Sequence, residues 1–282
     1  MNTTSAAPHR SYCHPIDASI IRALDNPAVN TVFRKALSIA ADSSFGQMIA
    51  TAIPVNEHSF PHLHEMVKHC ADTLRIPMPY VVVSSALGFN AFTTGSDKEP
   101  YIVLGSMLVK ALKEEQLHFV IGHECGHIAM GHVIYQSVVN VLTMLAKTVP
   151  ILGEIVNSTA GIALNAWSRR SEITADRAGL LCCGDLEVAQ RALLQLEMGL
   201  IDIKDANITD YLQSSKQYRN GGIIRRLGEY TQSHPMLSKR MEALELFMGS
   251  SLLHRIAGQK PPQNAINDRE LERRIEKLVR VL

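Results

Sequence analysis

The feature that most constrains this chain is the pentapeptide His123-Glu-Cys-Gly-His127, inside a stretch of predicted helix covering residues 113–135. Two histidines four positions apart project from one helix face, about one turn apart, so both imidazoles can reach a single zinc ion. Glu124 projects about 100° further round the helix, beside the metal position and not on it. That position suits a general base for a zinc-bound water. The motif predicts a zinc-binding helix with His123 and His127 as ligands.

A zinc site of this kind needs a third protein ligand, and the sequence after the pentapeptide narrows the choice. The longer pattern HExxHxxGxxH is excluded, because its glycine and last histidine are replaced by Met130 and Val133. Glu172 and Asp176 lie four positions apart in a second predicted helix, so their carboxylates share one face. One can bind the metal while the other accepts a hydrogen bond from a ligand imidazole. We expect His132 to make only a structural hydrogen bond.

The apolar periodicity predicts an α+β fold that is mostly helical, with a small sheet ahead of the zinc-binding helix. Expected strands cover residues 80–84, 90–94 and 101–105. Expected helices cover residues 31–41, 61–74, 106–112, 113–135, 166–181, 186–198 and 234–247. The apolar stretch 133–167 is expected to form a buried helical hairpin that turns near residues 150–153.

The composition excludes several classes of protein. A net charge of +1 gives no electrostatic case for nucleic-acid binding. Five cysteines, two of them adjacent at Cys182 and Cys183, do not suggest a disulfide framework, so we predict a reducing compartment and a cytoplasmic location. The longest uncharged stretches of the apolar segment, 133–146 and 155–168, are shorter than the roughly 18 residues of a membrane span. Membrane association stays possible but is not favoured.

Four motifs, in this order, resemble the zinc metallopeptidase family that includes the bacterial heat-shock protease HtpX and the eukaryotic CaaX prenyl protease. HExxH followed by ExxxD is the gluzincin pattern, and the motifs are the strand 90–95, the active-site helix 123–132, the ligand helix 172–180 and the His-Pro…Arg element 234–240. Together they cover about residues 79–246. The chain departs from the membrane-embedded members of that family, because it has no convincing transmembrane segment. The resemblance implies a zincin-like metalloprotease fold and proteolysis, whereas zinc chemistry alone would equally allow hydrolysis of other esters or amides.

The resemblance also implies a cofactor, a substrate class and a division of labour. The cofactor is one Zn²⁺ per chain, and the substrate is a protein or peptide. The zinc ligands are His123, His127 and Glu172, and Glu124 moves the proton from the water to the leaving amine. Asp176 orients a ligand imidazole.

Three further residues and one loop histidine receive roles. His234 precedes a proline suited to the first turn of a helix, which by itself favours a surface histidine in a loop. The resemblance implies instead that His234 donates a hydrogen bond to the oxyanion. Arg240 is predicted to anchor that loop to the acidic ligand helix, through Asp176. Asn90 and Ala91 are predicted to bind extended substrate along a strand edge, whereas Phe92 is expected to pack in the core.

The chain divides into three predicted segments. Residues 1–30 are expected to be irregular, residues 31–257 to form the zinc metallopeptidase domain, and residues 258–282 to form a charged amphipathic helix. That helix either packs on its own domain or mediates self-association, and the sequence leaves both open.

Two alternatives to this scheme remain at the level of sequence. The chain could be a non-catalytic, chaperone-like or assembly module that retains the fold, although the intact Glu124 argues against this. Cys13 with His14 could cap the zinc in a latent form, and Cys125 is expected only to pack.

Overall fold

The computed structural model describes residues 11–15, 51–95, 99–133, 159–199, 202–219 and 237–280 of the chain. For residues 159–165 and 218–219 it describes the helix but not the side chains. Three sequence predictions lie wholly outside the described residues: the helix 31–41, the turn of the hairpin at 150–153, and the loop histidine His234. Of a fourth, the irregular segment 1–30, only residues 11–15 are described.

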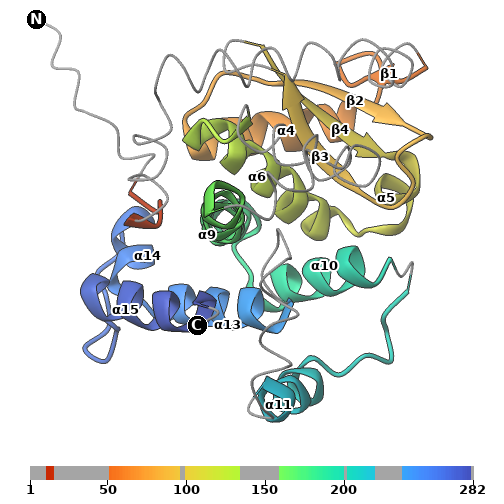
Figure 1. The fold of residues 1–282 in the computed structure, drawn as a ribbon. Helices are drawn as coiled ribbons and strands as arrows, with labels where there is room; N and C mark the ends of the chain where they lie inside the picture. Colours follow the sequence, from red (N-terminus) through yellow and green to blue (C-terminus); the bar gives the residue numbers. More distant parts are fainter. Residues whose placement is uncertain are drawn as a thin grey trace, which may run out of the picture.

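A four-stranded sheet has the strand order β1-β2-β4-β3 (Figure 1). The strands are β1 (Ile53–Pro54), β2 (Tyr80–Ser84), β3 (Ala91–Gly95) and β4 (Pro100–Gly105). The two inner strands, β2 and β4, run parallel to each other. β1 pairs antiparallel with β2, and β3 pairs antiparallel with β4. The two inner strands are rich in valine and isoleucine and are mostly buried, as strands covered on both faces require. Because β3 is last in the strand order, it is an edge strand of the described sheet.

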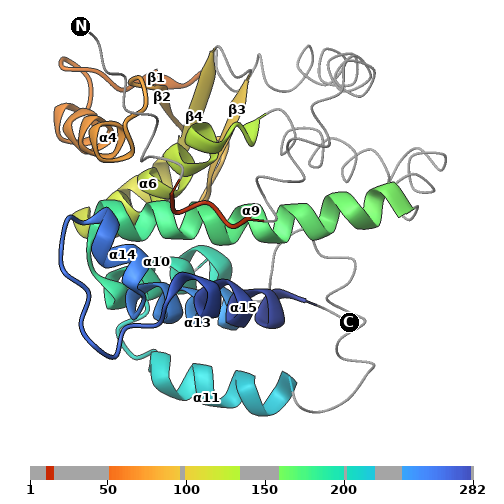
Figure 2. The same ribbon diagram turned by 90° about the vertical axis from the view of Figure 1, so that its left-hand side faces the viewer.

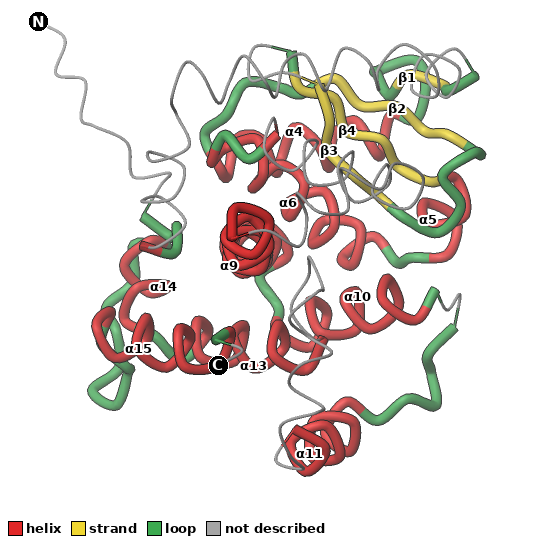
Figure 3. The backbone as a smooth tube through the Cα atoms, viewed as in Figure 1, coloured by secondary structure: helices red, strands yellow, loops and turns green. Residues whose placement is uncertain are grey.

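Helices make up most of the rest of the described chain (Figure 3). Those ahead of the second ligand motif are α4 (Pro61–Leu74), α5 (Ser106–Ala111) and α6 (Glu114–Met130). Those that follow are α9 (Thr159–Cys183), α10 (Leu186–Met198), α11 (Ile208–Arg219), α13 (Leu237–Met248), α14 (Ser251–Ile256) and α15 (Asp268–Val279). The α+β, mostly helical fold is confirmed.

α9 lies at the centre of the molecule. The sheet, α4 and α6 form a layer on one side of it, and α10, α13 and α15 form a layer on the other (Figures 1 and 2). Every side chain described from residue 167 to 180 is buried, which explains why this helix has no pronounced amphipathic pattern.

α6 and α9 pack closely because glycines stand at their crossing. A Cβ on Gly122 would lie 2.6 Å from Cβ of Cys182, and one on Gly126 would lie 2.6 Å from Cβ of Ala178. Both distances are far below van der Waals contact at roughly 3.5–4.0 Å, so neither position accepts a larger residue without moving a helix. This packing brings the HExxH segment of α6 directly against α9.

Both ends of the described chain pack on the helical body. Tyr12 is buried, and its backbone oxygen accepts a hydrogen bond from Arg177 of α9 at 2.9 Å. α15 packs on α13 and buries one apolar face, formed by Leu271, Ile275 and Val279. The division of the chain at residues 30 and 257 stays a prediction.

The structure differs from the predicted helices beside both ligand motifs. The sequence predicts one helix through residue 135, whereas α6 ends at Met130, because Gly131 takes a left-handed φ of 71° and turns the chain. The expected helix 166–181 instead begins at Thr159, so it is continuous with the described end of the predicted hairpin. None of the described helices is both long and apolar enough to cross a membrane.

Candidate metal centre

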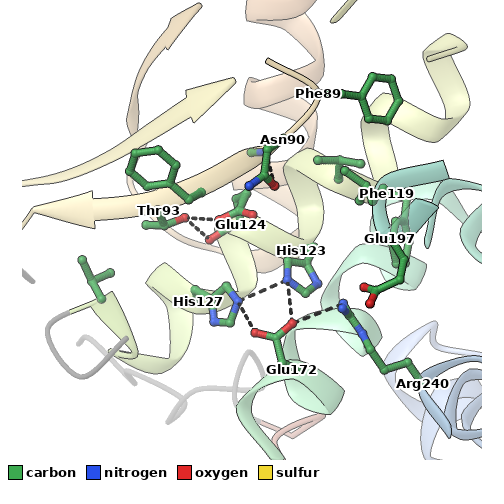
Figure 4. Close-up of a pocket in the computed structure, with 15 residues that line it drawn as sticks. Phe89, Asn90, Thr93, Phe119, His123, Glu124, His127, Glu172, Glu197 and Arg240 are labelled. Carbon is green, nitrogen blue, oxygen red and sulfur yellow. Dashed lines mark hydrogen bonds and ion pairs between the residues drawn. The ribbon is translucent and has the colours of Figure 1, made fainter. Parts of the chain in front are cut away.

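Three of the predicted site residues converge on one point between α6 and α9 (Figure 4). The Nε2 atoms of His123 and His127 lie 3.2 Å apart. Glu172 approaches both rings from α9, with its two oxygens each 3.6 Å from one of these nitrogens. The i, i+4 spacing on α6 brings the two rings together, and the close packing of α9 adds the carboxylate.

The spacing of these atoms fits a tetrahedral zinc ion. Ligand atoms bonded tetrahedrally to zinc at about 2.0–2.2 Å lie roughly 3.3–3.6 Å from one another, and the three observed separations are 3.2, 3.6 and 3.6 Å. In each ring the other nitrogen, Nδ1, faces its own hydrogen-bond partner, which directs the Nε2 lone pair of the neutral ring to the shared point. Two lone pairs and a carboxylate aimed at one position could hold a cation.

Asp176 and Arg240 contact the candidate ligands on the side away from the shared point. Oδ1 of Asp176 lies 3.0 Å from Nδ1 of His123. Arg240 of α13 binds the same carboxylate through two nitrogens, at 2.6 and 2.8 Å, and lies 3.3 Å from Glu172. The structure thus brings Asp176 and Arg240 together as the sequence predicted, and it places both beside the candidate ligands.

The protonation of His123, His127 and Arg240 depends on their burial and on the neighbouring carboxylates of Glu172 and Asp176. Burial and the neighbouring His123 lower the pKa of His127 well below its usual value, which favours the neutral, metal-binding ring. Burial also acts to lower the pKa of His123, but its hydrogen bond to Asp176 and the charge of Glu172 outweigh this effect and raise that pKa. Burial disfavours the charge of Arg240, yet the same two carboxylates raise its pKa, so the guanidinium stays protonated.

Glu124 lies beside the three candidate ligands and not among them. The hydroxyl of Thr93, on β3, lies 2.6 Å from Oε2 of Glu124 and 3.2 Å from its backbone oxygen. Burial raises the pKa of Glu124, and the charge of His123 and the hydrogen bond from Thr93 oppose the rise. A buried carboxylate with a raised pKa, held in one orientation, is suited to accept a proton. Thr93 is a contact that the sequence analysis missed.

A second missed contact involves His132. Its Nδ1 lies 3.0 Å from Nδ1 of His127, so the hydrogen bond predicted for it goes to a candidate metal ligand. The signal for this contact was Gly131, which marks the end of α6 and returns the next residue toward the preceding turn.

A cavity of about 580 Å³ lies over the site and is lined by all three candidate ligands. Asn90, which is labelled in Figure 4, and Ala91 were predicted to bind substrate, and both line this cavity. Phe92 also lines it. The expectation that Phe92 packs in the core is wrong, because its ring is only half-buried on the edge strand. Glu197, at the end of α10, also lines the cavity and carried no signal in the sequence.

The structure also describes Cys125, predicted to pack in the core, and Cys13, a possible cap of the zinc. Cys125 is fully buried, as a packing residue should be. The latent arrangement with Cys13 is not present, because Cys13 contacts the backbone of His14 and the imidazole of His14 lies 3.5 Å from Glu272 of α15. Neither residue lines the cavity over the candidate metal ligands.

Comparison with known proteins gives a consistent result. Residues 57–247 match the model of peptidase family M48. Plastoglobule-localized metallopeptidase 48, chloroplastic, from Arabidopsis thaliana is 31% identical over an alignment of 236 residues that covers 79% of this chain and 68% of the relative. A protease HtpX homolog from Paenarthrobacter aurescens is 28% identical over 228 residues (72% and 78%). Protease HtpX from Pseudomonas fluorescens is 29% identical over 236 residues (72% and 77%).

These relatives overturn the predicted cytoplasmic location. The plant relative is named as a plastoglobule-localized, chloroplastic protein. The prediction rested on cysteine content, which reports on the redox conditions that a protein tolerates and does not identify its compartment.

The match spans all the described site residues, from Asn90 to Arg240, and the relatives are named as proteases and a metallopeptidase. The resemblance inferred from four sequence motifs is confirmed, and the chain belongs to peptidase family M48, a family of metallopeptidases.

Proposed function

We propose that this protein is a zinc-dependent endopeptidase that holds one zinc ion per chain on His123, His127 and Glu172. The observation that carries the proposal is the convergence of two Nε2 atoms and a carboxylate with separations of 3.2 and 3.6 Å. Histidine and carboxylate donors with an open fourth position are the ligand set of catalytic zinc. When bound there, zinc would lower the pKa of a water ligand to about 7 and polarise the peptide carbonyl.

Glu124 is the proton carrier in this proposal. Because Thr93 binds Oε2 of Glu124, we assign the proton transfer to Oε1, which would accept a proton from the attacking water and deliver it to the leaving nitrogen. The raised pKa that burial gives Glu124 makes its carboxylate a stronger base than an ordinary glutamate, which favours the first transfer, from the water.

The edge strand β3 is the proposed binding site for the substrate backbone. Asn90 accepts the N–H of Gly105 on β4 through its backbone oxygen at 2.9 Å, so the N–H of the next residue, Ala91, points to the opposite edge. That N–H donates to the side-chain Oδ1 of Asn90 at 2.9 Å. An extended peptide that added to this edge would take over the hydrogen bond and displace the amide of Asn90.

Asp176 and Arg240 have positioning roles in the proposal. Asp176 accepts Nδ1–H of His123 and so fixes the ring with Nε2 toward the metal, and Arg240 holds Asp176 in place. His234, predicted to donate to the oxyanion, keeps that role as a proposal.

The function is tested by incubating the full chain with a loosely folded protein such as casein. Proteolysis produces new amino termini that mass spectrometry locates. We expect cleavage that stops when a chelator removes the metal and returns when zinc is added. The non-catalytic, chaperone-like alternative is not favoured, and it predicts that the protein binds casein but leaves every peptide bond intact with or without zinc.

A further inference from the structure

The two candidate histidine ligands have different partners behind them. Nδ1 of His123 faces the carboxylate of Asp176 at 3.0 Å, whereas Nδ1 of His127 faces Nδ1 of His132, also at 3.0 Å. A ligand imidazole commonly donates its second N–H to a carboxylate, a backbone carbonyl or a water. For His127, the partner in this position is instead another imidazole, that of His132.

The direction of the hydrogen bond follows from the chemistry of the ring. Nε2 of His127 points to Nε2 of His123 and to Glu172, so the lone pair that binds a metal must be on Nε2 and the proton on Nδ1. Two nitrogens 3.0 Å apart share one proton, so Nδ1 of His132 is the acceptor. His132 must then carry its own proton on Nε2.

The fold keeps His132 in this position. Gly131, with a left-handed φ of 71°, ends α6, and the backbone N–H of His132 returns to the carbonyl of His127 at 2.9 Å. The ring of His132 lies edge-on to Trp167 of α9, with centroids 5.5 Å apart and planes at 89°. Both side chains are 0% exposed. Its position is therefore set by the end of one ligand helix and by the packing of the other.

We propose that His132 is a positioning residue that accepts Nδ1–H of His127 and thereby fixes its Nε2 toward the metal. This inference rests on the proposed zinc site. Because the acceptor is neutral, it orients the ring without adding a second negative charge behind the site, where Asp176 already supplies one and Arg240 offsets it.

The test compares zinc dissociation constants, measured by competition with a chromophoric chelator, for three variants. His132→Phe keeps a ring against Trp167 but has no acceptor. His132→Asn keeps an acceptor near the position of Nδ1 and loses ring packing. His118→Phe, on α6, is the control, because the described contact of the His118 ring is with the ring of His69 and not with a candidate ligand.

We expect His132→Phe to weaken zinc binding about 10–100-fold, with His132→Asn and His118→Phe close to wild type. Thermal unfolding of each metal-free protein reports packing separately, and there His132→Asn should be the more destabilised of the two His132 variants. Equal zinc affinity of wild type and His132→Phe, or an equal loss in His132→Phe and His132→Asn, would overturn the inference and leave the zinc site intact. A wild-type protein that binds no zinc would instead overturn the proposed function itself.

Discussion

Asp176 and Arg240 form a two-point ion pair, with Nε to Oδ2 at 2.8 Å and Nη2 to Oδ1 at 2.6 Å, although Asp176 is only 1% exposed. A buried pair of this kind seldom adds net stability, because the desolvation of both charges offsets their attraction. Here the ion pair fixes the position of the Asp176 carboxylate, which contacts Nδ1 of His123 at 3.0 Å. α13 is thereby connected to a candidate zinc ligand on α6 through one side chain of α9.

Arg240→Met should destabilise the metal-free protein by about 3–5 kcal/mol, because it leaves two carboxylates, Asp176 and Glu172, buried without their cation. Urea unfolding in the presence of a chelator measures the change. Arg255→Met is the control, since Arg255 pairs with Asp268 at the exposed surface, and it should cost at most about 1 kcal/mol. Similar losses in the two variants would contradict this reading of the buried pair.

Asp176→Asn should lower the affinity for zinc about 10–100-fold, because the amide is a weaker acceptor for Nδ1–H of His123. Titration against a competing chelator measures the affinity. Asp185→Asn is a suitable control, since Asp185 caps the start of α10 and does not line the cavity. An affinity equal to that of wild type would show that Asp176 does not orient the ligand.

Glu124→Gln should retain zinc and the fold but lose peptide hydrolysis by about 10²–10⁴-fold in kcat, because only the proton carrier is removed. Steady-state hydrolysis of a fluorogenic peptide, together with zinc analysis of the same sample, separates the two effects. Glu115→Gln, at an exposed position on the same helix, should behave as wild type. Loss of zinc from Glu124→Gln would contradict this assignment and indicate that Glu124 binds the metal.

Gly126→Ala should cost about 1–3 kcal/mol of stability, because the added Cβ would meet Ala178 of α9 at 2.6 Å. Denaturant unfolding measures the cost. A Cβ on Gly249 would come no closer than 3.6 Å to any neighbour, so Gly249→Ala is the control and should change stability little. If both variants unfolded at the wild-type midpoint, the α6–α9 packing described above would be wrong.

The sequence predicted the local elements well wherever periodicity was clear. The helices 61–74 and 186–198 and the strand 80–84 occur with those bounds, because apolar spacing and flanking turn residues define them. Three short or polar elements were missed: β1 has two residues, α14 has six, and α11 has few apolar positions.

The candidate site was predictable as far as spacing within helices fixed it. His123 with His127, and Glu172 with Asp176, follow from the i, i+4 rule. The contacts of Thr93 with Glu124 and of His132 with His127 depend on how β3 approaches α6 and on where α6 ends. Neither is a periodic property of the sequence, although Gly131 was a usable signal for the second.

The proposed zinc site, between α6 and α9, consists of two histidine nitrogens and one carboxylate. Elemental analysis of protein purified without chelator tests it most directly, in wild type, His127→Ala and Glu172→Gln. We expect one zinc per wild-type chain, and much less in both variants under the same washing conditions. Wild-type protein without zinc, or a zinc content that is unaltered in His127→Ala, would contradict it.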